Sequence, residues 1–65
     1  MRNNFRVLLA KKRIKISDVH KITHISKSTL TNLYYERTKN PKSETLLKVA
    51  NFLEVTIDEL LATEQ

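Results

Sequence analysis

The stretch ISKSTLTNLYY, residues 25–35, divides into two faces when it is wound as an α-helix. One face is apolar and has the i, i+3, i+4 spacing of a helix that packs on a core: Leu30, Leu33 and Tyr34. The other face carries uncharged groups that donate and accept hydrogen bonds: Ser28, Thr31, Asn32 and Tyr35. A merely solvated helix face usually carries Lys and Glu, so this face is suited to contact with the base edges of duplex DNA.

Positive charge is concentrated in the first two thirds of the chain. Residues 1–42 hold eleven Lys or Arg and two acidic residues, a net charge of +9, whereas residues 43–65 hold one Lys and five acidic residues, a net charge of −4. Such a division predicts one pole that faces a polyanion and one that faces away. Four cations surround the uncharged helix face and could hold phosphates: Lys27, Arg37, Lys39 and Lys42. The expected partner is therefore double-stranded DNA.

Length and composition exclude several classes of protein. The chain has 65 residues and no Cys, so it is expected to form a single small domain over residues 1–65, without a disulfide or a thiolate metal site. No apolar run approaches the roughly 20 residues of a membrane span. The first 13 residues are too charged for a signal peptide. We therefore expect a soluble, cytoplasmic protein that does not contact a membrane.

Apolar residues recur with a helical period throughout, which predicts an all-α fold of five short helices. The first three are expected at about residues 3–13, 16–23 and 26–37, the third with Ser26 as its N-cap. Residues 39–42 form a loop because Pro41 disfavours helix at the residue before it. Ser43 is expected to cap the fourth helix, and the spacing Thr56-x-x-Glu59 is a capping box for a fifth that runs through Leu61. The expected core positions are Phe5, Leu8, Leu9, Ile16, Val19, Ile22 or Thr23, Leu46, Val49, Ala50 and Leu53.

The second and third expected helices are short and are joined by the tight turn His24-Ile25, which is the arrangement of a helix-turn-helix motif. In that motif the second helix of the pair lies in the major groove, with its N-terminal end nearest the bases. The free N–H groups at this end also favour a phosphate.

The string SKSTLTNLYYERTKNPKSETLLKVANFLEVTIDELL, residues 26–61, resembles the recognition helix, loop and trailing helices of the Cro/repressor-type helix-turn-helix family, also called lambda-repressor-like. With the first helix included, the resemblance covers nearly the whole chain. It implies a compact five-helix DNA-binding domain with its helix-turn-helix at the second and third helices. It also implies a sequence-specific transcriptional regulator of phage or bacterial type, most simply a repressor.

The resemblance assigns roles to individual residues. Positions that usually reach bases or adjacent phosphates are occupied by Lys27, Ser28, Thr31, Asn32 and Tyr35. Phosphate contacts are expected from the helix cap Ser26, from the loop and from the second helix, which gives the set Ser26, Lys15, Lys21, Lys39, Asn40 and Lys42. Buried family positions are matched by Val19, Ile25, Leu30, Leu33, Leu46, Leu47, Val49, Ala50 and Leu53.

Four residues depart from the family pattern. His20 stands where the family has a small Ala, and His24 stands where it has the Gly of the motif turn. His24 is expected to adopt a positive φ, which His tolerates better than most residues. Ile16 replaces a Gln that holds a phosphate, so that contact passes to Lys15 or Lys21. Glu54 replaces a frequent turn Gly.

Other functions have less support in the sequence. His20 and His24 have an i, i+4 spacing that could hold a metal, but no Cys and no intervening Glu completes a site, so we expect no metal and no cofactor. No catalytic set for an enzyme such as a nuclease is visible. A rival function from another class is that of an antitoxin, a protein-interaction module that binds a partner toxin and autoregulates its operon.

A symmetric homodimer is expected because two DNA half-sites multiply the weak affinity of one recognition helix. Its interface is predicted in the acidic C-terminal part, with Phe52, Leu60 and Leu61.

Overall fold

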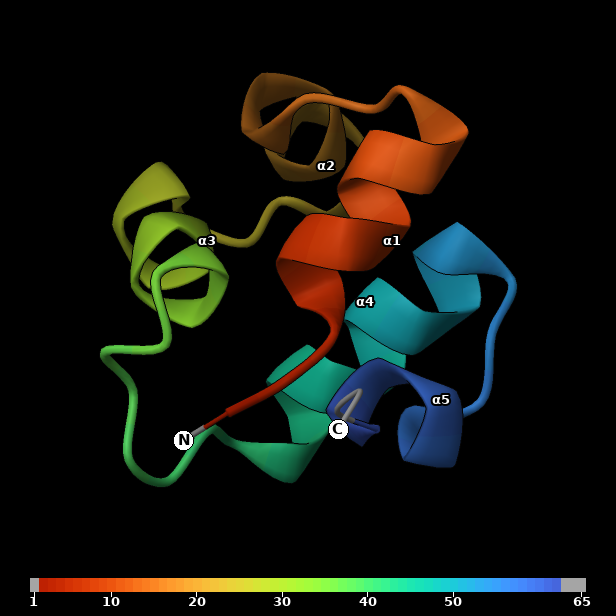
Figure 1. Cartoon of the computed structure of the whole chain (residues 1–65). Helices are drawn as coiled ribbons and strands as arrows, with labels where there is room; N and C mark the ends of the chain where they lie inside the picture. Colours follow the sequence, from red (N-terminus) through yellow and green to blue (C-terminus); the bar gives the residue numbers. More distant parts are fainter. Residues whose placement is uncertain (1, 63–65) are drawn as a thin grey trace.

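The computed structural model describes residues 2–62 and places five helices there, which confirms the predicted all-α fold (Figure 1). Their bounds are α1 Phe5–Lys12, α2 Ile16–Thr23, α3 Lys27–Tyr34, α4 Ser43–Leu53 and α5 Ile57–Leu61. α2 contacts both α3 and α4, while α1 contacts α3 and α5. The two helices of the predicted helix-turn-helix, α2 and α3, therefore pack on α4 and α1, which are joined by α5.

One core holds the five helices together. Each helix contributes a side chain with no exposed surface, and these are Phe5, Val19, Leu30, Val49 and Leu60. Complete burial of such a side chain stabilises the fold by about 1.5–3 kcal/mol. Each predicted core residue of α1 is buried, as are Ile25 and the four predicted positions Leu46, Val49, Ala50 and Leu53.

The structure resolves one open alternative and corrects two predicted apolar placements. Of Ile22 and Thr23, Thr23 turns inward, and Ile22 is 63% exposed. Leu47 is 51% exposed because the buried face of α4 passes through its neighbour Leu46. Leu60 is fully buried in the core of its own chain, so it cannot form a dimer interface as predicted.

The residues before α1 connect two distant helix ends. The Asn3 side chain donates to the Leu33 carbonyl at 3.0 Å and accepts from the Phe5 N–H at 2.8 Å. The Asn4 N–H donates to the Leu60 carbonyl at 2.7 Å. α1 therefore begins at Phe5 rather than at residue 3, because both Asn residues are occupied by contacts to α3 and α5.

The first four helices each end beside a residue with a left-handed backbone, although the chain has no Gly. Arg13, with φ 56°, ends α1 one residue earlier than predicted. Glu36, with φ 59°, ends α3 at Tyr34 rather than near Arg37. The next N–H then bonds to a carbonyl five residues back, from Arg37 to Asn32 at 2.8 Å and from Ile14 to Leu9 at 2.9 Å. This closure satisfies carbonyls that would otherwise lack a partner.

The start of α4 also differs by one residue from the prediction. Lys42 is the N-cap, with an extended backbone, and Ser43 is the first helical residue. No side chain caps this helix. The prediction for α5 is confirmed: Thr56 accepts from the Glu59 N–H at 3.0 Å, and the Glu59 carboxylate accepts from the Thr56 N–H at 3.4 Å.

Candidate nucleic-acid interface

The turn between α2 and α3 is held by two side chains of α2. His24 adopts the predicted positive φ, 62°, and its N–H donates to the His20 carbonyl at 2.9 Å. The Thr23 hydroxyl accepts from the Ile25 N–H at 3.3 Å and donates to the Val19 carbonyl at 2.7 Å. Since a carbonyl can only accept, Nδ1 of His20 donates to the Ile25 carbonyl at 2.6 Å. His20 thus has a positioning role that its place in the sequence did not reveal.

Ser26 caps α3, as predicted. Its hydroxyl accepts from the Thr29 N–H at 3.1 Å and lies 2.8 Å from the Thr29 hydroxyl, to which it donates. The hydroxyl is therefore occupied inside the protein. The N–H groups of Lys27 and Ser28, which have no carbonyl one turn before them in the helix, form the positive end of α3.

The two predicted faces of α3 exist. Leu30 and Leu33 are buried, with 0% and 2% exposure, and the Tyr34 ring packs edge-on against Phe5 with ring centroids 6.4 Å apart. On the polar side, three predicted residues are exposed and two are half-buried. The exposed ones are Lys27, Ser28 and Tyr35, and the half-buried ones are Thr31 and Asn32.

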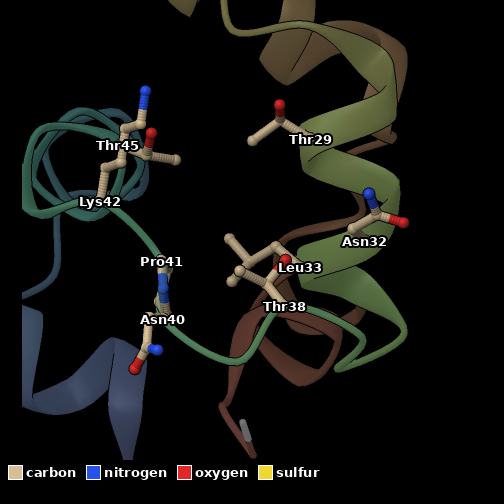
Figure 2. Close-up of a pocket in the computed structure, with 8 residues that line it drawn as sticks. All are labelled: Thr29, Asn32, Leu33, Thr38, Asn40, Pro41, Lys42 and Thr45. Carbon is tan, nitrogen blue, oxygen red and sulfur yellow. The ribbon is translucent and has the colours of Figure 1, made fainter.

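A hollow of about 250 Å³ separates α3 from the loop that leads into α4 (Figure 2). Its walls are polar except for Leu33 and Pro41, and α3, the loop and α4 all contribute to them: Thr29, Asn32, Leu33, Thr38, Asn40, Pro41, Lys42 and Thr45. The Lys42 and Asn40 side chains leave the loop in opposite directions on either side of Pro41 (Figure 2). The structure thus brings Asn32 together with Asn40 and Lys42, which the sequence assigned to separate elements.

Thr29 and Thr45 line the same hollow, and sequence reasoning missed both. Thr29 lies one helical turn after Ser26 and one turn before Asn32, so its spacing could have indicated that it faces this way. No local signal marks Thr45, because α4 reaches α3 only through the packing of the core.

The predicted cations of the second helix occupy different surroundings. Lys15 is the N-cap residue of α2, and its N–H donates to the Asp18 carboxylate at 3.1 Å. Lys15 also lines an open hollow with Tyr34 and Tyr35, so it lies near the C-terminal end of α3. Lys21 on α2 and Lys39 in the loop are exposed, and neither lines the hollow beside Asn32 or the one that Lys15 borders.

Aromatic and cationic groups meet at the C-terminal end of α3. The Tyr35 ring lies edge-on to Tyr34, with centroids 4.9 Å apart. The guanidinium carbon of Arg37 lies 5.2 Å from the Tyr35 ring centroid. This is within the distance at which a cation is attracted to the face of an aromatic ring.

Within residues 2–62, no group of three or more His, Asp or Glu side chains is placed to hold a metal ion. No helix in the same range is long and apolar enough to cross a membrane.

A search of curated proteins found no match to this chain. The model of one family, described as the Cro/C1-type HTH DNA-binding domain, matches residues 4–65 and so covers nearly the whole sequence. Its helix-turn-helix corresponds to α2 and α3, whose turn is held by the hydrogen bonds of His20 and His24. The chain belongs to the Cro/C1-type HTH DNA-binding domain family.

Proposed function

We propose that this chain is a sequence-specific transcriptional regulator that reads the major groove of DNA with α3 and represses transcription by occupying its site. One observation carries the proposal. The helix that buries Leu30 and Leu33 presents an uncharged polar face on its other side, within a part of the chain that is otherwise strongly basic. Base edges require matched donors and acceptors, whereas phosphates require cations.

Asn32 is the residue to which we assign the strongest base contact. Its amide can pair with N6 and N7 of adenine, and such a bidentate pair contributes about 1–3 kcal/mol of discrimination. Further contacts to base edges or adjacent phosphates come from Lys27 and Ser28, the first two residues of α3, and from Thr31, which lies on the same face as Asn32. Tyr35 lies at the far end of this face.

The hollow beside α3 is where we place one sugar-phosphate strand. Lys42 and Asn40 border it, and the first N–H groups of α4 are available to a phosphate because no side chain caps that helix. The backbone N–H groups after Ser26 bind a phosphate at the start of α3. The exposed cations Lys15, Lys21 and Lys39 add attraction at the ends of the interface.

Selection of bound duplexes from a random pool tests this function. We expect a defined sequence to be enriched and its affinity to fall steeply as salt is added. Recovery of unrelated sequences, or no association even in dilute buffer, would contradict the proposal.

Asn32→Ala tests the reading role on the selected duplex. We expect a loss of about 1–3 kcal/mol on that duplex and relaxed preference at one base pair, measured by fluorescence anisotropy. Lys42→Ala is the matched comparison, since it should weaken every duplex alike and lower the salt dependence. Equal weakening of all duplexes by Asn32→Ala would refute the assignment.

We further propose that the regulator binds as a homodimer through Phe52 and Ile22 rather than through the buried Leu60. Ile22, Lys48 and Phe52 border a shallow hollow between α2 and α4. Two copies of a chain with net charge +5 repel each other unless they meet where charge is balanced. Lys48 is paired with Glu44 at 3.1 Å, which gives this surface such a balance. Light scattering of the chain with and without DNA tests this, and a monomer in both would refute it.

An antitoxin remains the second candidate, and the exposed apolar side chains favour it. Leu47 is 51% exposed and Ile22 is 63% exposed, so a protein partner could cover them. If an adjacent reading frame encodes a small toxic protein, co-expression should rescue growth and yield a stable complex. Growth arrest that this chain does not relieve would exclude the antitoxin.

A further inference from the structure

The aromatic rings near α3 form a column that runs from the core to the surface. Phe5 is completely buried, Tyr34 lies edge-on to it, and Tyr35, which is 56% exposed, lies edge-on to Tyr34. The Arg37 guanidinium lies over the Tyr35 ring at the outer end of the column. A cation that would otherwise move freely on a long side chain is therefore held against a support fixed in the core.

The Arg37 backbone is also fixed. Glu36 has the left-handed conformation, and the Arg37 N–H then donates to the Asn32 carbonyl at 2.8 Å. Arg37 thus follows α3 in a defined geometry, although it lies three residues beyond the last helical residue, Tyr34.

The position of Tyr35 relates this pair to the proposed reading face. Tyr35 follows Ser28 by seven residues and Thr31 by four, so all three share one side of α3. Seven residues rise about 10 Å along a helix, and the major groove is about 12 Å wide. If the N-terminal end of α3 reaches the bases, its C-terminal end lies close to one of the strands that border the groove.

We propose that Arg37 binds a DNA phosphate at the edge of the groove and that Tyr35 is the residue that positions its guanidinium. This inference rests on the proposed DNA-binding function. Guanidinium has five N–H donors and suits phosphate oxygens better than an ammonium group does. A carboxylate partner would neutralise the charge of the guanidinium. The aromatic face holds the guanidinium and leaves its charge available to a phosphate.

The test is fluorescence anisotropy on the selected duplex and an unrelated duplex over a series of salt concentrations. Arg37→Ala should weaken binding about tenfold on both duplexes and lower the salt slope by about one. The matched control is Arg6→Ala, which removes the same charge from an exposed position on α1 and should change affinity less than twofold. Circular dichroism of each variant confirms that it is folded.

Two Tyr35 variants test the positioning role. Tyr35→Phe keeps the ring, so Arg37→Ala should cost as much affinity in the Tyr35→Phe background as it does in the parent chain. Tyr35→Leu should weaken binding about threefold while Arg37 is present, and its effect should be clearly smaller in the Arg37→Ala background. Arg37→Lys, which does not perturb the aromatic column, should keep the salt slope but lose affinity.

Different outcomes overturn different statements. If the parent chain binds no duplex in dilute buffer, the proposed function fails, and this inference fails with it. If the parent chain binds but Arg37→Ala behaves like Arg6→Ala, only the phosphate contact is refuted. If the effects of Tyr35→Leu and Arg37→Ala are additive, the positioning role of Tyr35 is refuted.

Discussion

The turn between α2 and α3 and the turn between α4 and α5 both contain a left-handed residue that is not Gly, His24 with φ 62° and Glu54 with φ 59°. After Glu54 the helix end is closed by backbone alone, since the Val55 N–H donates to the Ala50 carbonyl at 3.0 Å. After His24 the corresponding residue, Ile25, has its N–H bonded to Thr23 and its carbonyl bonded to His20.

The two turns depend on side chains to different degrees. Backbone closure after Glu54 is available to any residue that adopts the conformation. The turn that sets the angle between α2 and α3 needs a hydroxyl at Thr23 and a ring N–H at His20. Substitutions in the turn between α2 and α3 should therefore affect DNA binding as well as stability. Substitutions in the turn between α4 and α5 should affect stability alone.

His20→Ala is expected to have the largest effect. It leaves the Ile25 carbonyl without its partner, so the free energy of unfolding should fall by about 1–2 kcal/mol. For a domain of this size, each kcal/mol corresponds to about 4–8 °C in Tm. Calorimetry gives the loss, and DNA affinity measured well below Tm should also decrease. His20→Gln, which retains an N–H donor, is the control, and an unchanged Tm for His20→Ala would show that the bond does not brace the turn.

Thr23→Val should have the next largest effect. Thr and Val side chains have nearly the same shape, so the change keeps the packing. It removes the hydroxyl that accepts from the Ile25 N–H and donates to the Val19 carbonyl. We expect a loss of about 1 kcal/mol in chemical denaturation. Thr23→Ser keeps the hydroxyl and should retain most of the stability. If Thr23→Ser lost as much free energy of unfolding as Thr23→Val, the effect would come from packing and not from hydrogen bonding.

Glu54→Gly and His24→Gly make the smallest expected changes, and they form a matched pair. Gly adopts positive φ without steric cost, so Glu54→Gly should raise the free energy of unfolding by about 0.5–1 kcal/mol. His24→Gly should raise it less, because His tolerates this region better than Glu. Thermal unfolding measures both variants side by side. Marked unfolding of His24→Gly would reveal a packing role for that imidazole.

Much of the fold followed from periodicity, because the spacing of Leu30 and Leu33 or of Leu46, Val49 and Leu53 indicates a buried helix face without further information. Helix ends were less predictable. Arg13 and Glu36 have no strong preference for positive φ, and their conformation results from the closure of the adjoining turn. Leu47 and Ile22 look like core residues by type, and only the packing angle of their helices leaves them exposed.

Local sequence patterns are enough to show that the chain is helical, that its positive charge lies mainly before residue 43, and that α3 has one apolar and one uncharged polar face. These properties depend on spacings within a few residues. The tertiary structure brings separate segments together: His20 with Ile25 across the turn, Asn32 with Lys42 across a hollow, and Arg37 with Tyr35. Such contacts depend on helix crossing angles and turn conformations, which arise from packing of the whole core rather than from any local pattern.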